Sequence, residues 1–275
     1  MHDGFLTYKK FKFLKLASAV CLSVFIAYFF HKPIDEPNGG TWLGYVLGTI
    51  GALLIVWLMA LGIRKRRYGA NFNLSAWVSA HVYLGLSLIV IATLHTGFQF
   101  GWNIHTLAYV LMMVVILSGA FGIYAYTRFP KLMTENRRGA SRDELLSQVG
   151  EIDSECKKLM MRLPNNVSDV MLKATEETKL GGTIFQILSG RDKTCASVVA
   201  FERLQTLVGD VDDQHTQKTR QSMILMGKKC FLLNTLRRDI QVKALLDIWL
   251  SVHVPMSIAL IVALIIHVFS VFYYW

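Results

Sequence analysis

Four histidines form two pairs with the same spacing inside strongly apolar segments. His81 and His95 are 14 residues apart, and so are His253 and His267. On an α-helix this spacing is almost four turns, so both members of a pair share one face, roughly 21 Å apart along the axis. A bilayer has a hydrocarbon core about 30 Å thick, so each helix would carry one imidazole near each leaflet. Two such helices side by side would offer two bis-imidazole sites, a geometry that suits two haems.

The chemistry of imidazole fits this interpretation. Neutral imidazole is a good iron ligand and brings no charge into lipid. When two imidazoles hold one iron, no coordination position stays open, which suits outer-sphere electron transfer rather than oxygen binding. A helix–helix hydrogen bond is the alternative for any single membrane histidine. Four histidines in two identical spacings favour haem ligation.

The composition and its patterning predict the elements that must position these histidines. The chain is 53% hydrophobic and only 17% charged, whereas soluble domains average about 25% charged residues. The apolar residues come in long blocks, which indicates an integral membrane protein. Five membrane-spanning helices are predicted, at about 12–30, 42–63, 75–98, 105–127 and 246–274. We therefore predict an all-α membrane protein, with a haem-binding four-helix bundle and an N-terminal anchor helix.

The net charge of +10 is concentrated at one side of this five-span arrangement. The basic clusters occur at Lys9–Lys15, Arg64–Arg67, Arg128–Arg138 and Arg237–Lys243. The positive-inside rule then predicts a cytoplasmic N-terminus and an outward C-terminus, and we expect a bacterial inner membrane. Because the charge follows the spans, it indicates orientation and contact with membrane lipid, and we expect no nucleic-acid partner.

The same patterning divides the chain into three parts. Residues 1–127 hold spans one to four, residues 128–245 form a helical cytoplasmic insert, and residues 246–275 hold the fifth span, which completes the bundle. In the insert, Ser141 and Glu144 are placed to form a capping box that opens a helix. From about Thr216 the helical pattern is expected to continue into the last span.

The topology predicts which histidines face each other. Spans three and five run in the same direction, so His81 pairs with His253 at the cytoplasmic end, and His95 pairs with His267 at the outer end. His105 opens the fourth span. It is expected to bond an outer propionate, to carry protons at a quinol site, or to replace His95 as ligand, with an ordinary interfacial role as the alternative.

Glycines and arginines complete the predicted cofactor-binding set. Gly48 and Gly62 in the second span are also 14 residues apart and would give a porphyrin room beside the outer and inner sites. Ordinary small-residue helix packing explains them equally well. Arg64 and Arg128 are placed to pair with the inner propionates, because guanidinium binds carboxylates bidentately; a role as topology anchors is the alternative.

The four histidines and their glycines resemble those of di-haem b-type membrane cytochromes. The pattern is similar to the cytochrome b of quinol–cytochrome c reductases, and its topology is more similar to the ferric reductase and NADPH oxidase superfamily, where spans three and five carry the ligands. The sequence departs from that superfamily in showing no sixth span and no flavin and nicotinamide domain, and it shows no Pro-Glu-Trp-like quinol motif. The resemblance covers about residues 42–127 and 246–275.

These observations lead to one expected function and two alternatives. We expect a di-haem b-type cytochrome that moves electrons across the membrane, as an electron-transfer subunit of a membrane oxidoreductase rather than a self-sufficient enzyme. Its partners would be quinol or a redox protein that docks on the insert or on the outer face. One alternative is a ferric-reductase-like core that sends electrons outward from a cytoplasmic reductase. The other is a non-redox transporter or scaffold.

Overall fold

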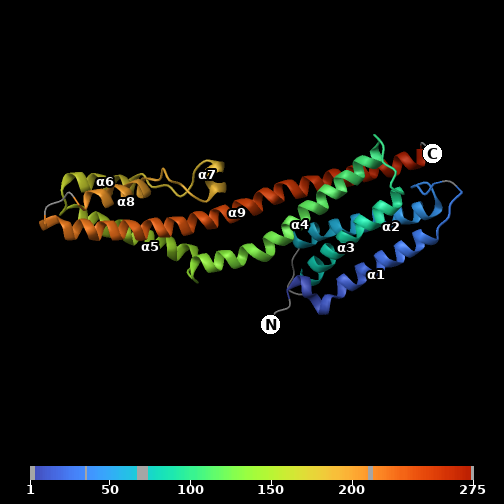
Figure 1. Ribbon diagram of the computed structural model, residues 1–275, viewed down its shortest axis with the longest axis horizontal. Helices are drawn as coiled ribbons and strands as arrows, with labels where there is room; N and C mark the ends of the chain where they lie inside the picture. Colours follow the sequence, from blue (N-terminus) through green and yellow to red (C-terminus); the bar gives the residue numbers. More distant parts are fainter. Residues whose placement is uncertain (1–3, 35, 67–73, 210–212, 274–275) are drawn as a thin grey trace. The chain divides into compact units, whose positions relative to one another are not determined.

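The computed structural model describes residues 4–34, 36–66, 74–209 and 213–273, and within them it contains helices and no strand. The side chains of 63–66, 213 and 214 are outside this description. After a short 3-10 turn the helices are α1 (Tyr8–Phe30), α2 (Trp42–Arg66), α3 (Leu74–Thr96), α4 (Ile104–Arg137), α5 (Arg142–Met160), α6 (Asn165–Glu176), α7 (Ile184–Ser189), α8 (Ala196–Leu207) and α9 (Asp213–Tyr273) (Figure 1).

Five of these helices, α1, α2, α3, α4 and α9, are long and apolar enough to cross a membrane. This confirms the predicted all-α membrane fold. In lipid, only a helix or a closed barrel satisfies every backbone polar group, so long apolar runs adopt helix whatever their neighbours. The chain forms two compact units, which we call the membrane unit (Met1–Phe121 with Leu250–Trp275) and the insert unit (Gly122–Trp249).

Local backbone conformation explains where α1 begins and where α3 ends. Lys9, Lys10 and Phe11 have positive φ, so the regular part of α1 starts at Lys12, where the first span was predicted to start. The third span was predicted to reach residue 98, but α3 ends at Thr96. Gly97 has a φ of +58°, and a Cβ on it would overlap the Pro37 carbonyl, so this turn requires glycine.

The membrane unit has a core to which four helices contribute. Leu58 of α2, Leu88 of α3, Met112 of α4 and Leu260 of α9 are all buried in one apolar cluster. These are the helices of the predicted haem-binding bundle.

Helix α1, predicted to be an anchor, packs closely against the same unit. Its Val24 is buried with Leu47 of α2 and Ile91 of α3, and the Tyr83 hydroxyl donates to the Leu6 carbonyl at 2.9 Å. Figure 1 shows α1 running alongside α2 and α3. The N-terminal helix is therefore part of the bundle's packing.

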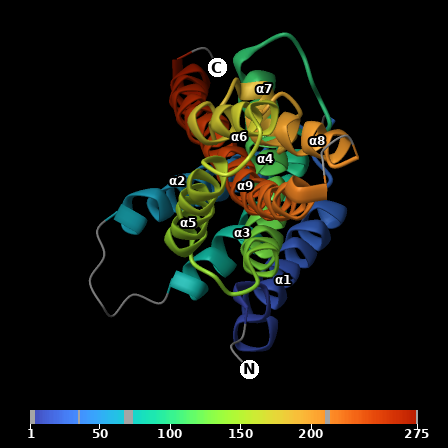
Figure 2. The ribbon, with the colours of Figure 1, turned by 90° about the vertical axis from the view of Figure 1, so that its left-hand side faces the viewer.

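The insert unit has a core of its own, formed by α5, α6, α8 and the first part of α9, which Figure 2 shows gathered together. The capping box at α5 is present as predicted: Glu144 N donates to Ser141 Oγ at 3.1 Å, and Ser141 N donates to Glu144 Oε2 at 2.7 Å. Lys229 is 1% exposed and donates to Asp153 Oδ1 and to the Ala174 carbonyl. Helix α9 is continuous for 61 residues, which confirms that the last span extends from the insert.

Candidate functional site

The two histidines of α3 hydrogen-bond to the backbone of α2. His95 Nδ1 lies 2.8 Å from the Gly44 carbonyl oxygen, and His81 Nδ1 lies 3.1 Å from the Leu58 carbonyl oxygen. Gly44 and Leu58 are themselves 14 residues apart, so the antiparallel helices repeat one contact at the histidine spacing. A carbonyl oxygen only accepts hydrogen bonds, so Nδ1 must carry the proton in both rings. In the neutral imidazole, the lone pair of each ring is then on Nε2.

The two histidines of α9 hydrogen-bond to side chains of α4, again through Nδ1. His253 Nδ1 lies 2.7 Å from Ser118 Oγ, while the Ser118 hydroxyl donates to the Val115 carbonyl at 2.9 Å. The hydroxyl has one hydrogen, so Ser118 accepts the Nδ1 proton of His253. His267 Nδ1 hydrogen-bonds to His105 Nδ1, and the two ring centres are 4.5 Å apart.

The structure brings the two outer histidines close to each other. The ring centres of His95 and His267 are 6.1 Å apart, with the ring planes at 90°. At the other end, His81 is held by α2 and His253 by α4. All four side chains are partly buried. The outer positions are consistent with the predicted pairing of His95 with His267, whereas the inner pairing and metal ligation stay predictions.

A cavity lies beside the outer pair. Its volume is about 560 Å³ including its open mouth. Helices α2, α3, α4 and α9 all contribute to its wall. Most of the lining is apolar, and the polar side chains are those of His95, Thr96, His105, Tyr109 and His267. Three imidazoles therefore meet at a mostly apolar space.

The glycines at the histidine spacing have different surroundings. A Cβ on Gly48 would lie 2.7 Å from His95 Cε1, so only glycine lets α2 approach this ring. A Cβ on Gly62 would meet nothing within 4 Å. Gly119 of α4 approaches the inner pair, where an added Cβ would lie 3.6 Å from His253 Cε1. The equal sequence spacing of Gly48 and Gly62 therefore does not give them equal contacts.

The remaining predicted site residues are placed as follows. His105 lines the outer cavity and contacts His267, so it belongs to the outer site. Arg128 is exposed on the part of α4 that belongs to the insert unit, and the side chain of Arg64 lies outside the described residues. Pairing of either arginine with a propionate stays a prediction. Among the described residues, no group of three or more His, Cys, Asp or Glu is arranged to hold a metal ion; a haem takes only its axial ligands from the protein.

Sequence reasoning missed three partners of the histidines: the Gly44 and Leu58 carbonyls and the Ser118 hydroxyl. The carbonyls carry no side-chain signal. Ser118 did carry one, because it is a hydroxyl inside an otherwise strongly apolar part of the fourth span. An intramembrane polar side chain usually has a specific partner.

A scan of the chain against protein-family models, a search of curated proteins and a search of solved structures each returned no match.

Proposed function

We propose that the chain is a di-haem b-type cytochrome that carries electrons across a membrane as a subunit of a membrane oxidoreductase. The observation that carries the proposal is the common anchoring of four regularly spaced imidazoles through Nδ1. A metal-ligating histidine almost always bonds its other ring nitrogen to a carbonyl, a carboxylate or water, which fixes its tautomer and orientation. For His81 and His95 the carbonyl partner leaves Nε2 as the nitrogen for a metal.

The spacing of the outer rings supports one pairing over the other. The His95 and His267 ring centres are 6.1 Å apart, so these two rings would hold the group between them. The His105–His267 separation of 4.5 Å leaves no room for a metal between the rings. The geometry therefore favours His95 over His105 as the partner of His267.

Each residue then has a definable task at the outer site. The Gly44 carbonyl holds the His95 ring, Gly48 leaves room for that ring against α2, and His105 orients His267. The mostly apolar lining would limit the access of water to the group. Bound between His95 and His267, a haem would supply one-electron transfer.

The proposal includes partners and an orientation. Membrane lipid surrounds the apolar spans. Electrons are exchanged with quinol or with a redox protein, which docks on the insert unit or on the outer face. The basic clusters beside the spans support a bacterial inner membrane with a cytoplasmic N-terminus and an outward C-terminus.

The decisive experiment is spectroscopy and haem extraction on the purified full-length protein in detergent. We expect reduced b-type absorbance bands and about two haems per chain, because the two histidine pairs define two bis-imidazole sites. His95→Ala and His267→Ala should each remove the outer haem, and His81→Ala and His253→Ala should each remove the inner one. His215→Ala, on the insert part of α9, is the control and should keep both.

The outcomes separate the proposed function from its rivals. A colourless protein overturns the proposal and favours a transporter or scaffold. Reduction on addition of quinol supports exchange with the quinol pool. Reduction only by a cytoplasmic reductase, without effect of quinone analogues, favours a ferric-reductase-like core.

A further inference from the structure

A polar groove lies in the insert unit, between the segment that follows α7 and one face of α9. Its volume is about 1,100 Å³ including its open mouth. Arg191, Lys193 and Arg238 bring three cations to its wall, and amide side chains come from Asn136, Asn234 and Gln241. Only Phe231 and Val198 add apolar side chains. The groove is far richer in polar groups than the cavity of the membrane unit.

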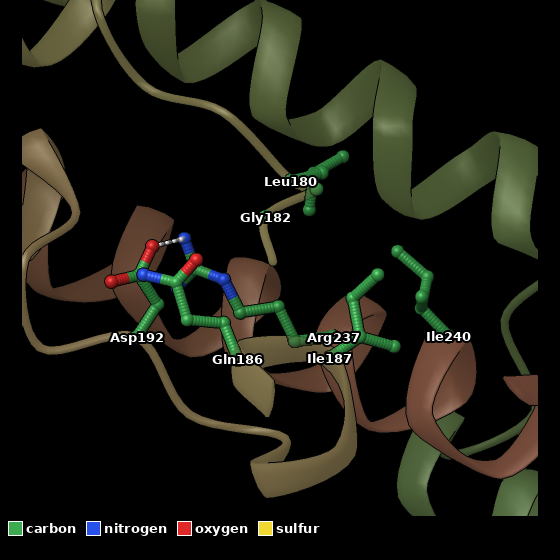
Figure 3. A pocket seen from close by; sticks show the side chains of 8 residues that line it. Leu180, Gly182, Gln186, Ile187, Asp192, Arg237 and Ile240 are labelled. Atoms are coloured by element: carbon green, nitrogen blue, oxygen red, sulfur yellow. Dashed lines mark ion pairs between the residues drawn. The ribbon is translucent and has the colours of Figure 1, made fainter. Parts of the chain in front are cut away.

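The segment that carries two of these cations is firmly attached to α9. Gln241 Nε2 donates to the Leu188 carbonyl at 2.6 Å. Gly190, with a φ of +65°, packs so closely on Gln241 that a Cβ would overlap its side chain. Arg237, which is buried, donates to the Lys179 carbonyl at 3.1 Å and pairs with Asp192 at 3.7 Å, as Figure 3 shows for the ion pair. The groove wall is therefore preformed.

The groove has a net positive charge, because its one carboxylate is already paired with another cation. Asp192 pairs with Arg237, and its Oδ1 accepts hydrogen bonds from the backbone and hydroxyl of Thr194 at 3.0 and 2.7 Å. Within the described part of the chain there are three ion pairs, and none includes Arg191, Lys193 or Arg238. These three cations line one groove, and none of them is paired with a carboxylate of the described residues. An anionic ligand would give them a negatively charged partner.

We propose that this groove binds a nucleotide through its di- or triphosphate group. Arginine forks match phosphate oxygens bidentately, and lysine adds a point charge, so a polyphosphate uses all three cations. The Arg138 guanidinium lies over the Phe231 ring at 5.3 Å from its centre, and the rest of this ring, which is 51% exposed, offers an apolar wall to a base. Asn234 on the same wall offers both a donor and an acceptor to the base edge. The scarcity of apolar lining leaves no place for acyl chains, which argues against a phospholipid.

The test is calorimetric titration of the full-length protein in detergent with ADP, pyrophosphate, adenosine and a short-chain phosphatidylglycerol. We expect ADP to bind more tightly than the other three. Lys193→Gln and Arg238→Gln should each weaken ADP binding by about tenfold, since each removes a charge-assisted hydrogen bond. Lys157→Gln, an exposed cation on α5 outside the groove, is the matched control and should leave ADP binding unchanged. Circular dichroism confirms that the variants fold.

Each other outcome overturns the proposal. Absence of ADP binding removes it outright. Equal affinity for pyrophosphate and ADP excludes a contact with the base, and equal affinity for adenosine and ADP excludes one with the phosphates. Binding of phosphatidylglycerol alone identifies a lipid site. An equal loss in Lys157→Gln and Arg238→Gln indicates general charge attraction. None of these readouts depends on haem, so this inference stands or falls separately from the proposed function.

Discussion

His95 and Gly44 are joined by a hydrogen bond from the imidazole Nδ1 to the backbone carbonyl, at 2.8 Å. Fourteen residues earlier on α3 and fourteen later on α2, His81 and Leu58 repeat the same bond at 3.1 Å. Helix α2 supplies no candidate ligand, yet it determines which ring nitrogen of both α3 histidines carries the proton. Metal-ligating histidines almost always have such a partner on the other ring nitrogen, so the two bonds support the proposed ligand role.

Gly48→Ala should disturb the outer site, and Gly62→Ala should not disturb the inner one. A Cβ on Gly48 would lie 2.7 Å from His95 Cε1, whereas a Cβ on Gly62 would meet nothing within 4 Å. Overpacking of this kind costs about 1–3 kcal/mol, so the His95 ring should move and outer haem occupancy should fall. Haem content per chain and the reduced spectrum measure the effect. Full occupancy in Gly48→Ala would contradict the assigned contact.

Ser118→Ala should weaken haem binding at the inner site about 10- to 100-fold, because His253 loses the partner of its Nδ1. Haem titration into the apoprotein measures this change. Ser118→Thr keeps the hydroxyl and should restore most of the affinity. Ser87→Ala is the control, since the Ser87 hydroxyl donates to the Leu84 carbonyl of its own helix. If Ser118→Ala and Ser87→Ala bind haem alike, Ser118 does not orient His253.

His105→Ala should retain an outer haem with an altered spectrum, whereas His95→Ala should lose that haem. The reason is that His105 contacts His267 through Nδ1 at a ring separation of 4.5 Å, which leaves no space for a metal between them. Electron paramagnetic resonance of the oxidised protein detects the changed ligand orientation. His105→Asn, which can still hydrogen-bond His267, should stay closer to the parent spectrum. If His105→Ala loses the outer haem and His95→Ala keeps it, then His105 is the ligand and His95 is not.

Asp153→Ala should destabilise the insert unit by about 3 kcal/mol or more, because it leaves the ammonium of Lys229 buried without its carboxylate. Lys229 is 1% exposed, while Asp153 is 25% exposed. Lys229→Met removes the buried charge itself and should cost less. Thermal unfolding followed by circular dichroism ranks the variants, with Glu155→Ala, at an exposed position on the same helix, as the control. A larger loss of thermal stability in Lys229→Met than in Asp153→Ala would contradict this account.

Much of the fold was predictable because lipid and local chain chemistry constrain it directly. Long apolar runs must be helical in a membrane, so the existence of the five apolar helices followed from composition and length. The capping box of Ser141 and Glu144 is a local hydrogen-bond pattern, and it was predictable from residue spacing alone. The close packing of α1 through Val24 was not predictable, because an isolated anchor and a packed helix have the same hydropathy.

The sequence by itself determined that His81 and His95 share one helix face, and that His253 and His267 share another, because helical periodicity relates residues of one helix. Only the tertiary structure decided that Gly44, Leu58 and Ser118 hold three of these rings. It also decided that His105 lies against His267, and that Gly48 but not Gly62 is pressed against an imidazole. Those contacts depend on the rotation and register of neighbouring helices. Rotation and register are set by side-chain packing between helices, which leaves no periodic trace in the sequence of either one.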